Sequence, residues 1–196
     1  VFLDPTKAIP LRGPKRNMPL PMEPTAIRDA LTNPDPAIAL AVSLIAFHAL
    51  TTQQVQHVQL TDIIDGRLRM PDGRSIPLAK PVRVRLTAWL DHRAKRWPET
   101  KNPYLLVTIQ TAPRLSPPSR NFPWRKAGVT AQALRTDRIL YEVEQTGGDV
   151  RRVCDLFGIG IETALRYSAT ILEPPTPGER APTHTGEIDN ESASTV

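Results

Sequence analysis

The stretch from residue 128 to residue 167 limits the possible folds most, because glycines divide it into three short helical runs. The glycine pair at 147–148 separates the first run from the second, and the Gly-Ile-Gly at 158–160 separates the second from the third. Thr130 and Asp149 are of the residue types that cap helix N-termini, and they stand where the first two runs begin. The sequence therefore predicts a compact unit of three short helices in this part of the chain.

Helical spacing sorts the side chains of this unit into faces. In the first run, Gln132, Arg135 and Arg138 recur every three residues and share one face. Tyr167 lies near the end of the third run, 32 positions after Arg135. One side of the third run carries Ile161, Leu165, Ser168 and Leu172. The unit is thus predicted to hold one arginine and one tyrosine on neighbouring short helices.

Residues 66–78 carry the clearest strand signal. Apolar and charged residues alternate over 67–70, a Pro-Asp-Gly turn follows at 71–73, and the chain returns through Arg74. This pattern predicts an antiparallel hairpin that carries Arg67, Arg69 and Arg74 as a basic finger. Charged side chains also keep a sheet edge soluble, so the finger has a purely structural interpretation as well.

The other segments complete a mainly helical prediction. They are a helix over 24–31, a buried helix over 37–50, a helix capped by Thr51 or Thr52, an amphipathic helix over 80–97, a short buried strand over 104–107 and a loop over 108–123. The predicted fold class is mainly α with a small antiparallel β-sheet (α+β), built around residues 66–78 and 104–107.

Charge divides the chain into three parts. The 196 residues carry a net charge of +5, made of −4 from residue 173 onward and +9 before it. We expect a proline-rich basic arm over 1–23, one domain over 24–172, and a disordered acidic tail over 173–196. A basic body favours a polyanionic partner such as nucleic acid, and it equally serves solubility.

Several classes of protein are disfavoured by composition. Cys154 is the only cysteine, so no disulfide can form within the chain, and no apolar run reaches 18 residues. His48 and His57 have no companion at metal-ligand spacing, and no glycine-rich phosphate loop or Ser-His-Asp arrangement is present. We expect no cofactor, no metal, no membrane contact and a cytoplasmic, nucleoid-associated location.

The ordered series of motifs resembles the catalytic domain of the tyrosine recombinases, the phage-integrase family. Residues 130–136 read TAQALRT and are similar to the family's T-x-H-x-L-R-H box; Gly-Asp-Val at 148–150, Leu-Phe-Gly at 156–158 and T-x-x-x-Y at 163–167 follow. Upstream, residues 48–55, 60–63 and 76–78 are similar to the family's arginine motif and to the end of its hairpin. The resemblance covers residues 1–172 and implies a mainly α domain, a third strand before the hairpin, and a separate DNA-clamping domain in a larger parent protein.

The departures from the family pattern fall on the residues that cut DNA. The family holds the scissile phosphate with two arginines, a lysine and a His or Trp, while a tyrosine attacks it. The first arginine position is Thr51, its accompanying acid is Gln54, the histidine position is Gln132, and the last His or Trp position is Gly158 or Ile159. Only Arg135 and Tyr167 match, so we predict a bacterial recombinase-type DNA-binding protein that is impaired or inactive in strand cutting.

Two alternatives stay open. One is an active site-specific recombinase with a rearranged site, in which Arg69 or Arg74 supplies a missing cation. The other is a helix-turn-helix transcriptional regulator that uses residues 149–169. The expected partners are double-stranded DNA and further recombinase subunits. The candidate DNA-binding residues are Arg135, Arg138, Gln132, Arg69, Arg74, Arg125, Lys126 and Arg166, and the candidate catalytic residues are Tyr167 and Arg135.

Overall fold

The fold was analysed on a computed structural model, which describes residues 21–172. The helices are α1 (Pro24–Leu31), α2 (Pro36–His48), α3 (Thr52–His57), α4 (Lys80–Arg96), α5 (Ala131–Gln145), α6 (Val150–Phe157) and α7 (Ile161–Leu172), with 3₁₀ turns η1 (Leu60–Asp62) and η2 (Trp124–Lys126). The strands are β1 (Ile63–Ile64), β2 (Arg67–Arg69) and β3 (Ser75–Pro77). Residues 1–20 of the predicted arm and the whole predicted acidic tail lie outside the described residues.

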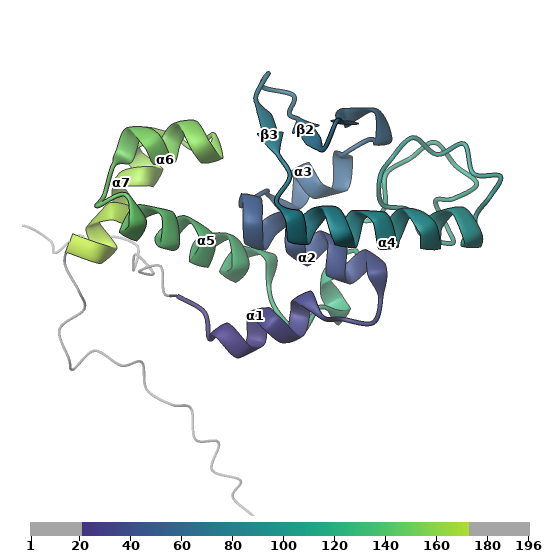
Figure 1. Ribbon diagram of the computed structural model, residues 1–196, viewed down its shortest axis with the longest axis horizontal. Coiled ribbons are helices and arrows are strands. Elements are labelled where there is room, and N and C mark those ends of the chain that lie inside the picture. The colour runs from purple at the N-terminus through teal and green to yellow at the C-terminus, as the bar shows by residue number, and fades with distance from the viewer. Residues whose placement is uncertain (1–20, 173–196) are drawn as a thin grey trace, which may run out of the picture.

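Helix α2 is the centre of the fold. Asp35 caps its N-terminus by accepting a hydrogen bond from the Ala37 backbone nitrogen, and Pro36 occupies the first helical position. All nine residues from 37 to 45 are buried, as a helix that is apolar all round requires. Helices α1, α4 and α5 pack around it (Figure 1), so the predicted buried helix is confirmed.

The sheet is small and antiparallel, with strand order β1-β2-β3. Leu68 pairs with Ile63 on one side and Ile76 on the other, and it is 1% exposed. Its burial fixes the register, because a slip of one residue would turn Arg67 or Arg69 into the core. The predicted hairpin and the third strand before it are both confirmed.

The predicted strand over 104–107 is wrong. Tyr104 forms one isolated bridge with Gln59, and the segment does not join the sheet. Its backbone groups are bonded elsewhere: Leu105 donates to the Val58 carbonyl and accepts from the Trp89 indole. Residues 105–107 are buried as predicted, but as irregular chain held between η1 and α4.

Helices α5, α6 and α7 form a second, smaller core. Ile139, Val143, Val153, Phe157 and Ala164 meet there, and α5 connects this core to the larger one around α2. In Figure 1, α5 runs from the body of the protein to α6 and α7, while the hairpin stands on the opposite side of the resulting gap. The three predicted helical runs are confirmed with their Thr130 and Asp149 caps.

The packing face of α7 differs from the one that spacing indicated. Ile161 and Leu165 are 67% and 52% exposed, whereas Ala164, Tyr167 and Ser168 are buried. The helix is therefore rotated relative to an arrangement that would bury its largest aliphatic side chains. This rotation brings Tyr167 into the second core.

Candidate functional site

Arg135 projects from α5 toward the end of α2. Its Nη1 donates a hydrogen bond of 2.7 Å to the carbonyl oxygen of Ala49, the residue that ends α2 in the left-handed conformation with φ of 50°. Burial lowers the pKa of Arg135; the nearby Tyr167 phenol raises that pKa and Arg74 lowers it. One guanidinium donor is thus committed to the backbone, and Arg74 and Tyr167 both lie close enough to Arg135 to act on its charge.

Tyr167 is 8% exposed and packs in the second core. The Tyr167 phenol lies close enough to Arg135 to raise its pKa, so the two residues that match the family motifs are neighbours in the structure.

Arg74 crosses from the hairpin to the end of α6. Its Nη1 donates to the Leu156 carbonyl at 2.9 Å, and its Nε donates to the Asp72 carboxylate at 2.8 Å. Gly158 ends α6 with φ of 60°, and a Cβ atom built there would lie 2.7 Å from Arg74 Cζ. A side chain at position 158 is therefore disfavoured twice, by the left-handed backbone and by the guanidinium above it.

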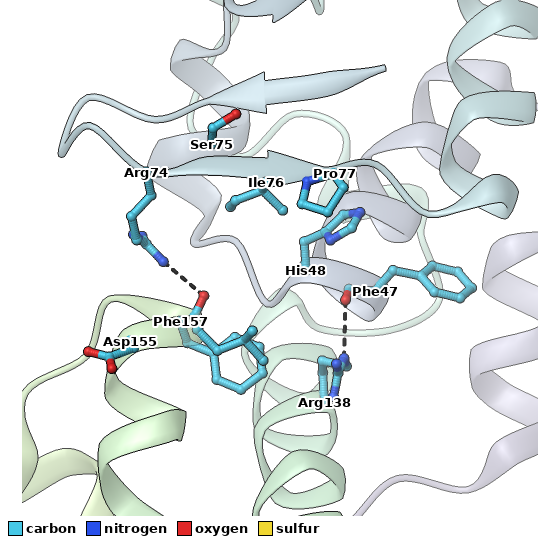
Figure 2. Close-up of a pocket in the computed structure, with 10 residues that line it drawn as sticks. Phe47, His48, Arg74, Ser75, Ile76, Pro77, Arg138, Asp155 and Phe157 are labelled. Carbon is cyan, nitrogen blue, oxygen red and sulfur yellow. Dashed lines mark hydrogen bonds between the residues drawn. The ribbon is translucent and has the colours of Figure 1, made fainter. Parts of the chain in front are cut away.

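A cavity of about 320 Å³ lies between the hairpin and the α5–α6 unit (Figure 2). Arg74 borders it from the hairpin, Arg138 from α5, and Asp155 and Phe157 from α6. The Arg138 side chain donates from Nε to the Phe47 carbonyl at 3.1 Å and lies over the Phe157 ring at 5.3 Å. The cavity therefore combines two guanidinium groups with an aromatic wall.

Arg138 is also part of an ion network. Its guanidinium bonds the Glu142 carboxylate at 3.0 Å, and Arg152 approaches the same carboxylate at 3.4 Å. Glu142 is only 8% exposed, so the two arginines offset the cost of burying its charge. Arg138 therefore has a structural partner, whereas Arg74 is paired with the more exposed Asp72.

His48, the last residue of α2, lines the same cavity. Burial lowers its pKa to about 4, and the positive charge of Arg138 adds to this effect. Its Nε2 accepts the Ala79 backbone N–H at 3.3 Å, which requires that nitrogen to be unprotonated. The histidine is therefore neutral near pH 7 and adds no positive charge to the cavity.

The first arginine position and its accompanying acid position serve a local purpose in this chain. The Thr51 hydroxyl accepts from the Gln54 backbone nitrogen at 3.1 Å, and the Gln54 side chain accepts from the Thr51 backbone nitrogen at 2.8 Å. This reciprocal pair is a capping box that starts α3. The Thr51 hydroxyl and the Gln54 side-chain oxygen therefore each accept a hydrogen bond from a backbone N–H group.

Of the predicted site residues, Arg74 and Arg138 line this cavity, and the others, Arg135 and Tyr167 included, do not. Gln132 is exposed on α5 and donates to the Thr136 hydroxyl. Arg166 is exposed on α7 and donates to the Thr163 hydroxyl. Exposed residues elsewhere are Arg69 on β2 and Arg125 and Lys126 on η2. Exposure of Glu162 and Arg166 is also what a helix-turn-helix reader would need of α7.

Sequence reasoning missed His48, Asp155 and Phe157 as cavity residues. The usable signal for His48 was its place at the end of an otherwise apolar helix, where a polar side chain can reach out of the core. Asp155 and Phe157 gave no signal, because their role depends on how α6 docks against the hairpin. Within residues 21–172, no helix is long and apolar enough to cross a membrane, and no group of three His, Cys, Asp or Glu side chains could hold a metal ion.

Comparisons with known proteins identify the fold. The sequence matches no protein-family model and no curated protein. The crystal structure of XerA recombinase superposes with a TM-score of 0.62 at 19% identity, covering 81% of this chain and 67% of that one. The pre-cleavage complex of XerH site-specific recombinase bound to difH substrate gives 0.58 at 16% identity, covering 80% of this chain and 53% of that one.

The chain therefore has a tyrosine recombinase catalytic-domain-like fold. It spans about two thirds of the length of the XerA chain and about half of the XerH chain. The resemblance inferred from the motifs is confirmed at the level of the fold. Activity, substrate and partners are not fixed by a likeness at this identity.

Proposed function

We propose that this protein binds double-stranded DNA through a recombinase-type cleft and does not cut the strands. The observation that carries the proposal is the use made of the substituted positions. Thr51 and Gln54 cap α3, and Gly158 leaves room for Arg74. Arg135 remains to meet a phosphate, and Tyr167 and Arg74 each lie close enough to it to act on its charge.

The remaining groups suit binding better than chemistry. A guanidinium offers a planar fork of donors to a phosphate, and it stays charged at all ordinary pH values. It can therefore hold a phosphate but cannot protonate a departing oxygen. Removing a single donor to a transition-state charge typically costs about 10²–10³ in rate, so the substitutions at several positions leave little cutting activity.

Binding is tested by a salt series with duplex DNA. Because each phosphate contact contributes about 0.9 to the slope of log affinity against log salt, Arg135→Ala and Arg74→Ala are each expected to lower that slope by about one. Arg28→Ala is the matched control, since it removes an exposed arginine from α1 on the other side of the body from the hairpin (Figure 1). Equal slopes for all three variants would contradict a cleft-centred site.

Strand cutting is tested with a nicked suicide substrate. We expect no covalent protein–DNA adduct, and Tyr167→Phe should leave DNA affinity unchanged within about twofold, because removing the hydroxyl group leaves the charge of the protein unaltered. A Tyr167-dependent adduct that survives denaturation would instead establish an active recombinase with a rearranged site.

The same assays address the helix-turn-helix alternative. A recognition helix at α7 would contact base edges through Arg166, so Arg166→Ala would relax sequence preference while Arg135→Ala had no effect. Our proposal predicts the reverse: Arg135→Ala weakens DNA binding, and Arg166→Ala leaves sequence preference unchanged. Circular dichroism melts of each variant ensure that only folded protein is compared.

A further inference from the structure

A second and larger cavity lies at the other end of α2. Its volume is about 630 Å³, and it is bordered by Asp35 and Ile38 in the first turn of that helix. His48, which borders the candidate DNA site, is the last of the 13 residues of α2. At 1.5 Å per residue the two cavities are separated by roughly 20 Å of buried helix. We refer to the larger one as the α2 N-end cavity.

The outer wall of the α2 N-end cavity is a long segment without helix or strand. No such element occurs between Arg96 and Trp124, and loops of that length inside a compact domain are usually functional. The segment is held in place from within: the Asn102 amide is 2% exposed and donates to the Thr111 and Ser116 carbonyls at 2.8 and 2.9 Å. The wall is therefore preorganised for a ligand.

Further anchors fix both ends of this wall. The Gln56 side chain donates to the Pro118 carbonyl at 2.8 Å across a sequence distance of 62 residues. Near the start of the loop, Thr108 and Thr111 bond each other through their hydroxyl groups and backbone. Bonds of this kind hold the cavity open without relying on a sheet or helix.

The lining is apolar at the base and cationic at the rim. Ile38 is 3% exposed and Phe122 packs against the larger core, so the base is hydrocarbon. Arg125 and Lys126 border the cavity as exposed side chains, and the structure records no hydrogen bond or ion pair for either within residues 21–172. Asp35 is already engaged as the cap of α2.

We propose that the α2 N-end cavity binds a small anionic molecule with an apolar or aromatic body. The volume falls within the range of small-molecule sites, which pair an apolar lining with a few oriented polar groups. These two cations would bind a phosphate, sulfonate or carboxylate at the rim, and the base would cover the body. Ile109, 69% exposed at the mouth, offers further apolar surface.

The anionic group could belong to a free small molecule or to a nucleotide of bound DNA. Both present the same chemistry to Arg125 and Lys126. The site is independent of the proposed DNA-binding function, because it lies at the opposite end of α2 from Arg74 and Arg135. Its test therefore stands whether or not duplex DNA binds at the hairpin cleft.

The probe is 8-anilinonaphthalene-1-sulfonate, an aromatic anion whose fluorescence rises in an apolar site. We expect one probe molecule per chain, and about a five- to tenfold weakening for Arg125→Gln and for Lys126→Gln, as for loss of a charge-assisted hydrogen bond. Ser119→Trp, at an exposed lining position, should fill the cavity and abolish binding. Arg151→Gln, an exposed arginine on α6, is the charge-matched control and should bind the probe as the unaltered chain does.

Three outcomes would overturn the proposal. They are absence of probe binding, binding unaffected by all three cavity variants, and binding that is lost in Ile161→Ser, since that exposed residue lies on α7. Adding duplex DNA then separates the two sources of the anion. Displacement of the probe assigns the cavity to a nucleotide of DNA, whereas retention of the probe assigns it to a free small molecule.

Discussion

The start of α3 and the hairpin use their polar residues in opposite ways. At the start of α3, Thr51 and Gln54 bond each other's backbone and form a closed local pair. On the hairpin, Arg74 reaches across 82 residues of sequence to the Leu156 carbonyl and fills the space above Gly158. The first, which we call the closed side, is satisfied without a ligand. The second, the cationic side, is a half-buried guanidinium held by Leu156 and Asp72.

This contrast teaches where a recombinase-like fold can change its site without losing its shape. A threonine and a glutamine convert one corner into a helix cap, which stabilises the fold by about 1 kcal/mol. A glycine at the end of a helix admits a cation from a neighbouring element. The fold is kept because both changes satisfy backbone groups that any version of these helices must satisfy.

Substitution at Gly158 should break the cationic side and have the largest effect. Gly158→Ala is expected to lower the free energy of unfolding by about 2–3 kcal/mol, from left-handed backbone strain and loss of the Arg74 bond to Leu156. Gly147 has nearly the same φ, 63° against 60°, with open space around it, so Gly147→Ala should cost only the strain.

A double-mutant cycle completes that measurement by denaturant unfolding. In an Arg74→Ala background, Gly158→Ala should cost no more than Gly147→Ala does, because the guanidinium that collides is gone. If the Gly158→Ala cost were unchanged by removing Arg74, the contact described at this corner would carry no energy.

Lowering the pH should protonate His48 beside Arg138 and thereby lower the free energy of unfolding. The folded pKa of about 4 lies below the ordinary histidine pKa of 6.5, so the unfolded chain binds the proton first as the pH falls. The stability from neutral His48 is present above pH 6.5 and is lost as pH falls to 4, by about 2 kcal/mol after allowance for partial exposure. His48→Gln should flatten the dependence of stability on pH between pH 4 and 6.5, because the titrating imidazole is gone.

Breaking the closed side should have the smallest effect. Thr51→Ala is expected to cost about 1 kcal/mol through loss of the α3 cap, and Thr51→Ser should cost little because its hydroxyl also caps. Thermal melts of the two variants supply the comparison. A Thr51→Ala variant as stable as Thr51→Ser, but with weaker DNA binding, would mean that this residue acts on a ligand and not on its helix.

Most elements of this fold could be predicted because their signals are local. Asp35-Pro36, Thr130 and Asp149 mark helix starts through contacts within three residues, and the Pro-Asp-Gly turn marks the hairpin. The matched motifs added the third strand. Each of these signals depends on residues a few positions apart, so it can be recognised in the sequence without knowing the tertiary structure.

The features that were missed depend on distant partners. An apolar run at 105–107 is equally compatible with a strand and with buried irregular chain, and the Trp89 indole and Val58 carbonyl decide between them. Burial of Tyr167 in place of Leu165 follows from how α7 docks on α5. Arg74 could be suggested as a cation, but its position over Gly158 depends on the docking of α6.

Three arginine side chains join the two cores through backbone carbonyls. Arg74, Arg135 and Arg138 span sequence separations of 82, 86 and 91 residues to Leu156, Ala49 and Phe47. Closing loops of that length costs chain entropy that local contacts do not, so we expect these bonds to form late, after each core has assembled. On that order of events, the candidate DNA site is completed only when the two halves of the chain have come together.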